Sequence, residues 1–139
     1  MKNFYTVTQI ANKDRSDLVF GILLNKEHRI YEGHFPQQPV VPGVCMTLMI
    51  RELAEEAVGS KLMFSEISNI KFLAIVNPMV NTELLIKLKL DLLETGSYSV
   101  KASVEFADRI FLTLKGKLST IKTSSDIDFS MIDKFEPEA

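Results

Sequence analysis

A proline-rich stretch that opens into an apolar segment limits the fold of this chain more than any other feature. The stretch consists of Gly33, His34, Phe35, Pro36, Gln37, Gln38, Pro39, Val40, Val41, Pro42, Gly43 and Val44. Proline fixes its own φ angle and disfavours helix at the residue before it, so the stretch is predicted to be extended and stiff. Apolar residues then recur at helical spacing from residue 44 to about residue 58. The sequence therefore predicts a rigid loop that ends in a tight turn and leads directly into a helix.

The predicted helix has one wide apolar face and one polar face. The apolar face, predicted to be core, comprises Met46, Met49, Ile50, Leu53, Ala54 and Ala57. The polar face comprises Thr47, Arg51, Glu52, Glu55 and Glu56, and it is interpreted as solvated, with Arg51 and Glu55 as i, i+4 partners. Leu48 lies in the middle of the polar face. A side chain of that size needs cover there, which an acyl chain, a partner subunit or an overlying strand would provide.

Segments with strand character flank the helix on both sides. They cover residues 4–11, 17–24, 62–76, 84–90, 98–106 and 110–121. The later segments alternate apolar with polar residues, which is typical of half-buried strands. Two strands, one helix and a meander of three or four strands predict an α+β domain in which an antiparallel sheet curls round the helix.

The length and composition of the chain predict a single domain. The 139 residues, of which 46% are hydrophobic, suit one core over residues 1–122. Residues 123–139 change to polar and charged types with scattered apolar residues, and they are predicted to form a loosely held tail. A subunit of this size has a high ratio of surface to volume, so pairing with a second copy is expected.

The histidine of the stretch and the start of the helix form a candidate site for chemistry at an acyl carbonyl. Histidine ordinarily titrates near physiological pH, so His34 is suited to act as a base. The first N–H groups of a helix lack internal partners and carry partial positive charge, so they are suited to hold a developing oxyanion. Gly43 has no side chain that blocks the approach of such an oxygen.

Three short motifs carry a resemblance to a known family. They are His34-Phe35-Pro36, Pro39-Val40 and Pro42-Gly43-Val44, with a weaker echo at Ile70-Lys71-Phe72 and Asn77-Pro78. This pattern resembles the hot-dog-fold 3-hydroxyacyl-acyl-carrier-protein dehydratases. The resemblance implies a sheet curled round one long central helix, in a homodimer or dimer-based oligomer. It also implies active sites at the subunit interface, each using a histidine of one chain and an acid of the partner's helix.

The resemblance carries over to particular residues, and one departure from the family pattern bears on catalysis. It implies catalytic roles for His34 and Gly43, and a substrate site lined by Phe35, Pro42, Val44, Leu48 and Phe72. In the family the acid stands fourteen residues after the histidine, and in this chain that position is Leu48. Glu52, one helical turn further on, is the remaining candidate acid. The alternatives are that protonated His34 returns its proton to the hydroxyl, or that a water held by Glu52 or Thr47 donates it.

Three classes of function follow from the resemblance. The first is a lyase that dehydrates 3-hydroxyacyl-acyl-carrier-protein to the trans-2-enoyl product in fatty-acid or related acyl-chain synthesis. The second is a noncatalytic acyl-binding module or subunit that kept the pocket, lost the acid and pairs with an active hot-dog partner. The third is a hot-dog acyl thioesterase, which needs a carboxylate or another water-orienting group near the thioester.

Composition and charge limit the other partners. A net charge of −2 and a pI near 5.7 give no general affinity for nucleic acid or anionic membranes. The single cysteine, Cys45, fits a reducing cytoplasm and is interpreted as a small buried residue, with a thiol of lowered pKa as the alternative. His28, between Lys26 and Arg29, is interpreted as a solvent-facing loop residue. Because no cluster has metal-ligand spacing, neither a metal nor a cofactor is expected.

Overall fold

The computed structural model describes residues 2–12, 14, 16–33 and 39–121. Its elements are β1 (Tyr5–Asn12), β2 (Asp17–Leu24), α1 (Ile30–Gly33), α2 (Gly43–Val58), β3 (Leu62–Phe72), β4 (Glu83–Leu92), β5 (Tyr98–Phe106) and β6 (Arg109–Thr120). The predictions for residues 34–38 and for the tail lie outside these described residues. No described helix has the length and apolar character needed to cross a membrane.

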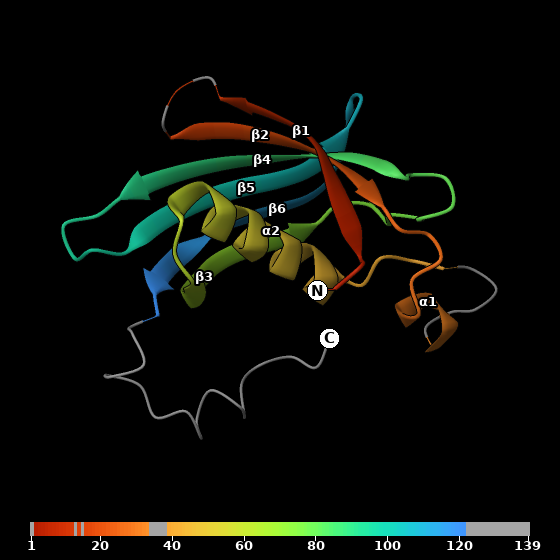
Figure 1. Ribbon diagram of the computed structural model, residues 1–139, viewed down its shortest axis with the longest axis horizontal. Coiled ribbons are helices and arrows are strands. Elements are labelled where there is room, and N and C mark those ends of the chain that lie inside the picture. Colours follow the sequence, from red (N-terminus) through yellow and green to blue (C-terminus); the bar gives the residue numbers. More distant parts are fainter. Residues whose placement is uncertain (1, 13, 15, 34–38, 122–139) are drawn as a thin grey trace.

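The strands form one antiparallel sheet in the order β1-β2-β4-β5-β6-β3. The meander β4-β5-β6 follows from the short turns between these strands, while β3 returns to the edge beside β6. Figure 1 shows α2 lying across one face of the curved sheet, with β1 at the edge opposite β3. The predicted α+β class and antiparallel sheet are therefore confirmed.

The core lies between α2 and the inner face of the sheet. Strand β4 shows the alternation of buried and exposed side chains clearly. Leu84, Ile86 and Leu88 are at most 2% exposed. The side chains of Lys87 and Lys89 are exposed. The buried residues of α2 are Cys45, Met46, Met49, Ile50, Leu53 and Ala54. Ala57 was predicted to belong to this face, but it is exposed because it lies in the last turn, one residue from the helix end.

His28 lies in the predicted loop, but its side chain is not fully solvent-facing. The side chain is half-buried, and its Nε2 lies 3.0 Å from the carbonyl oxygen of Lys2. Its Nδ1 accepts a hydrogen bond of 3.1 Å from the N–H of Ile30, at the start of α1. The ring of Phe4 meets the imidazole edge-on at 5.3 Å. The predicted loop position is confirmed, but the ring is partly covered because residues of the N-terminus pack against it. The local sequence does not reveal that contact.

Candidate active site

A groove of about 320 Å³ lies between the start of α2 and the segment that follows β3. It is lined by Val40, Val41, Gly43, Met46, Phe72, Leu73, Ala74, Ile75 and Val76. The N–H of Val41 donates to the carbonyl oxygen of Val76 at 2.9 Å and joins the two walls. The N–H of Leu73 donates to the carbonyl oxygen of Phe111 at 2.8 Å, which fixes the second wall to β6. Because every lining residue is apolar or glycine, the groove suits a hydrocarbon chain.

The ring of Phe72 lies directly over Gly43. A Cβ placed on Gly43 would collide with Phe72 Cε1 and lie 2.7 Å from Phe72 Cζ. Gly43 is the first residue of α2, so the helix begins one residue earlier than predicted and the glycine serves close approach rather than a turn. Phe72 is 57% exposed, so its ring has space to move away from the helix.

The first turn of α2 has backbone N–H groups that no described residue accepts from. Pro42 occupies the N-cap position and supplies no side-chain cap. Its carbonyl oxygen accepts from the N–H of Cys45 at 3.0 Å and from that of Met46 at 3.3 Å. Within the described ranges, the N–H groups of Gly43 and Val44 meet no acceptor. This end of the groove therefore offers hydrogen-bond donors and the positive end of the helix dipole to a ligand oxygen.

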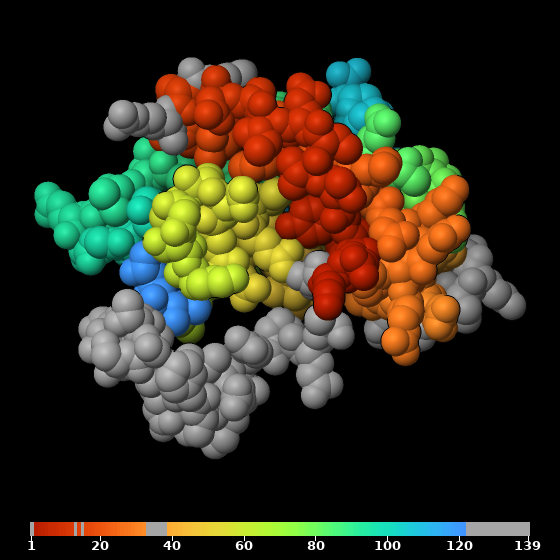
Figure 2. Space-filling model, viewed as in Figure 1, coloured from red at the N-terminus to blue at the C-terminus, as the bar shows by residue number. Residues whose placement is uncertain are grey.

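Glu52 contacts β1, which is the edge strand of the sheet opposite β3. It lies nine residues after Gly43, a rise of about 13 Å along the helix. Its Oε1 accepts a hydrogen bond of 2.9 Å from the hydroxyl of Tyr5 on β1. Burial and the charge of Glu52 raise the pKa of Tyr5, which therefore stays a donor. Figure 2 shows the N-terminal segment and β1 in red against the yellow surface of α2. A catalytic role for Glu52 stays a prediction.

The polar face of α2 is less solvated than predicted. Glu52 and Glu55 are half-buried, whereas Glu56 is exposed as expected. Oε2 of Glu55 accepts from the N–H of Leu62 at 2.8 Å, and among described residues it forms no ion pair with Arg51. The interpretation as a solvated face was wrong because the chain turns back after α2 and brings the start of β3 beside the helix. Local helical spacing does not reveal that return.

Three further residues of α2 bear on the candidate site. Leu48 is half-buried, which agrees with the cover expected for it. Val44 is 64% exposed beside the groove. The hydroxyl of Thr47 donates to the carbonyl oxygen of Val44 at 2.7 Å, so its hydrogen is already engaged with the helix backbone.

Two buried groups lie near the start of α2. Cys45 is 2% exposed, and burial raises the pKa of its thiol, so the alternative of a lowered pKa was wrong. The hydroxyl of Tyr31, in α1, is buried and has no hydrogen-bond partner among the described residues. Across all the residues that the structure describes, no group of three or more His, Cys, Asp or Glu residues is arranged to hold a metal ion.

The structure brings together two of the predicted site residues, Gly43 and Phe72, beside Pro42 and Val44. Residues 73–76 were predicted to continue the strand that begins at residue 62, but β3 ends at Phe72 and these residues form a wall of the groove instead. Sequence reasoning missed this wall because the segment that covers the helix start depends on the order of strands in the sheet. It also missed Tyr5 as the partner of Glu52. His34 and Phe35 lie outside the described residues, and their roles stay predictions.

The curled antiparallel sheet with one helix across its face defines a hot-dog-fold protein. A family model described as ApeI-like, ApeI dehydratase, matches residues 9–110, which is most of the chain. The chain therefore belongs to the ApeI-like dehydratase family. This membership confirms the resemblance that the motifs predicted.

Relatives and solved structures agree with this assignment. A protein named 3-hydroxyacyl-[acyl-carrier-protein] dehydratase FabZ, from Caldanaerobacter subterraneus subsp. tengcongensis, is 24% identical over 118 residues, covering 79% of this chain and 82% of the relative. A FabZ of the same name from a Thermoanaerobacter species is 26% identical over 118 residues, with the same coverage of both chains. A structure described as the dehydratase heterocomplex ApeI:P from Xenorhabdus doucetiae has a TM-score of 0.68 at 23% identity, covering 86% of this chain and 99% of the other.

Proposed function

We propose that this protein dehydrates 3-hydroxyacyl groups carried by acyl carrier protein to their trans-2-enoyl products. The activity is that of a cytoplasmic lyase in fatty-acid or related acyl-chain synthesis. One observation carries the proposal. In a member of a dehydratase family, an apolar groove ends at N–H groups of α2 that meet no acceptor among the described residues. The names of the relatives support the substrate class.

The reaction requires three catalytic tasks. We assign residues of this chain to the first two, whereas the usual acid for the third is missing. A base removes the C2 proton, and we assign this task to His34. A donor stabilises negative charge on the thioester oxygen, and the N–H of Gly43 is suited to it because no described group accepts from it. Such a donor lowers a barrier by about 3 kcal/mol when its geometry is good. The groove holds the acyl chain against Phe72 and the wall that follows it.

The third task is to protonate the departing hydroxyl. Leu48 occupies the position expected to carry the acid, and its side chain has no proton to give. Protonated His34 returning its proton is one route, and a water held by Glu52 or Thr47 is another. Glu52 accepts from Tyr5 and lies about 13 Å along α2 from Gly43, so we favour the route through His34. Without a positioned acid, turnover is expected to be slower by about 10²-fold or more.

A noncatalytic role is the second candidate, and Leu48 is the observation that favours it. In this account the chain binds the acyl group and an active hot-dog partner supplies the acid. The structural neighbour described as an ApeI:P heterocomplex makes a hetero-partner a concrete alternative to a second copy. In either assembly the exposed apolar residues beside the groove face another subunit.

The test is to incubate the purified protein with a 3-hydroxyacyl-acyl-carrier-protein and follow the conjugated enoyl thioester. Wild type is expected to form the enoyl product, and His34→Ala is expected to lose at least about 10²-fold in rate while keeping its circular dichroism spectrum. Activity that appears only after a second hot-dog protein is added would support the noncatalytic role. Release of free thiol without an enoyl product would identify a thioesterase and contradict both proposals.

A further inference from the structure

The face of the sheet turned away from α2 carries three lysines at directly opposite positions on neighbouring strands. Lys89 of β4 pairs with Lys101 of β5, and Lys101 pairs with Lys115 of β6. All three side chains are exposed, and the residues that precede and follow each of them are buried. This alternation places the three side chains, which we call the lysine row, on the outer face.

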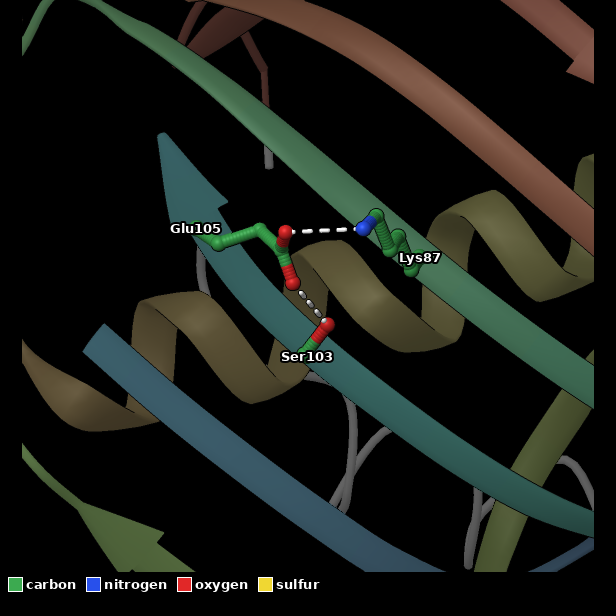
Figure 3. Close-up of polar contacts among 3 residues, drawn as sticks. All are labelled: Lys87, Ser103 and Glu105. Carbon is green, nitrogen blue, oxygen red and sulfur yellow. Dashed lines mark hydrogen bonds and ion pairs between the residues drawn. The ribbon is translucent and has the colours of Figure 1, made fainter. Parts of the chain in front are cut away.

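The lysine row is electrostatically unfavourable within the isolated chain. Like charges at directly opposite positions on neighbouring strands repel and weaken the pairing. An ion pair of the kind that would relieve such repulsion exists two residues before Lys89 on β4, where Lys87 Nζ lies 2.9 Å from Glu105 Oε1 (Figure 3). Within the described part of the chain, none of the three lysines of the row forms such a pair. Lys89 has Asp17 opposite it on β2, but Lys101 and Lys115 have no carboxylate at a directly opposite position. A local rule is therefore broken at this pair, which is typical of surfaces kept for function.

The surroundings of the lysine row limit what it can bind. Lys117 and Lys71 lie on the same face at neighbouring positions. Carboxylates bound the basic area, with Asp17 opposite Lys89 and Glu66 opposite Lys117. A hollow of about 360 Å³ adjoins the row, and it is lined by residues of β2, β4 and β5 that include Lys87, Lys89, Lys101 and Ser103.

We propose that the lysine row is the docking surface for an acidic helix of a partner protein. Adjacent strands lie about 4.8 Å apart, so three lysines on three strands span about 10 Å. Acidic residues at positions i, i+4 and i+7 of a helix also span about 10 Å, because each residue rises 1.5 Å. One helix laid across the strands therefore places a carboxylate opposite each lysine of the row.

The charge pattern selects a compact acidic protein over other anions. Nucleic acids and anionic membranes present charge over long distances and favour broad basic surfaces. Here the basic area ends at carboxylates on two sides, and the chain as a whole carries a net charge of −2. A short acidic helix fits inside these limits, whereas an extended polyanion would also meet Asp17 and Glu66.

The inference rests on the proposed function in one respect, which is the choice of acyl carrier protein as the partner to test. One end of the row borders the strand that leads into the groove. Asn69, on β3, pairs with Lys115 and precedes Phe72 by three residues, about 10 Å along the strand. The row thus ends beside the strand that leads into the groove, although on the opposite face of the sheet.

The test compares two double charge reversals in the full chain. Lys101→Glu with Lys115→Glu changes the row, and Lys26→Glu with Lys61→Glu is the matched control on exposed lysines outside the sheet face. Each variant is assayed with a 3-hydroxyacyl-acyl-carrier-protein and with the same acyl group on a short pantetheine thioester. The row variant is expected to raise KM for the carrier-linked substrate about 10-fold, with kcat and the short thioester unchanged. The control is expected to match wild type.

Two results would overturn the inference, and they differ from failure of the proposed function. An unchanged KM in the row variant would exclude docking on this face. Equal losses of activity on the two substrates would instead indicate damage to the groove. If wild type turns over neither substrate, the dehydratase proposal fails. Calorimetric titration with purified acyl carrier protein then decides the inference alone, because docking requires wild type to bind and the row variant to bind about 10-fold more weakly. Absence of binding to wild type contradicts it.

Discussion

Individual polar residues hold this fold through partners that lie far away in the sequence. Tyr5 donates to Glu52, and Glu55 accepts from the N–H of Leu62, so two carboxylates of α2 connect the helix to β1 and to β3. Both contacts are partly buried, where a hydrogen bond to a charged group contributes about 1.5–3 kcal/mol. The polar face of the helix is therefore part of the structural framework as well as a surface.

Glu105 gives a prediction about the pH dependence of stability. Burial alone would raise the pKa of Glu105, but the hydrogen bonds from Lys87 and Ser103 outweigh it and hold the pKa below its ordinary 4.5. A lowered pKa contributes stability above the ordinary value, and this contribution is lost as the pH falls through the folded-state value. Glu105→Gln is expected to lower the free energy of unfolding by about 1 kcal/mol near neutral pH and by progressively less below about pH 4.5.

Urea denaturation of wild type and Glu105→Gln over a series of pH values measures this difference. Ser99→Ala, a change on the same face of β5 outside the contacts of Glu105, is the control and is expected to show a pH-independent difference. If the difference in unfolding free energy between wild type and Glu105→Gln stayed constant from neutral to acid pH, the assigned role of the carboxylate would be contradicted.

The local sequence predicted the elements well because their patterns are local. The helical spacing of α2 and the alternation in β4, β5 and β6 each depend on residues a few positions apart, and the bounds of these four elements agree with the prediction to within one or two residues. The groove was not predictable in the same way. Its walls meet because β3 returns to the edge beside β6, which places Phe72 over Gly43. Only the order of strands brings these residues together.

The contact between α2 and the end of β3 gives a prediction by double substitution. Gly43→Ala places a methyl group where the Phe72 ring lies, and it is expected to cost about 1–3 kcal/mol of unfolding free energy. Phe72→Ala is expected to cost less than a buried phenylalanine, because the ring is 57% exposed. In the double variant most of the Gly43→Ala cost is expected to disappear, giving a coupling of about 1 kcal/mol or more.

Denaturant unfolding of the four proteins measures this coupling. Leu73→Ala in place of Phe72→Ala is the matched control, because Leu73 is also 57% exposed but does not meet the added methyl group. Additive costs for Gly43→Ala and Phe72→Ala would show that the Phe72 ring is not the reason why a side chain at position 43 is unfavourable.

At the scale of the whole molecule, the groove opens among exposed apolar side chains. The residues are Val44, Phe72, Leu73, Ile75, Met79 and Val80, each at least 54% exposed. Clusters of this kind mark interaction sites in soluble proteins. The proposed assembly places a second subunit over this cluster, so that the groove becomes a closed channel for the acyl chain.

Sedimentation velocity tests this assembly. Wild type is expected to sediment as two chains, and Ile75→Lys is expected to shift the protein toward one chain by placing a charge in the interface. Leu92→Lys is the matched control, because Leu92 and Ile75 are both 68% exposed and Leu92 lies away from the groove at the end of β4. A single-chain wild type, or equal effects of both substitutions, would contradict an interface at the groove.

The most direct measurement of the account is the rate at which purified wild type and His34→Ala form the enoyl thioester from the same carrier-linked 3-hydroxyacyl substrate. The account predicts formation by wild type and a loss of about 10²-fold or more in the folded variant. Equal rates in the two proteins would contradict the assignment of His34 as the base that acts beside the start of α2.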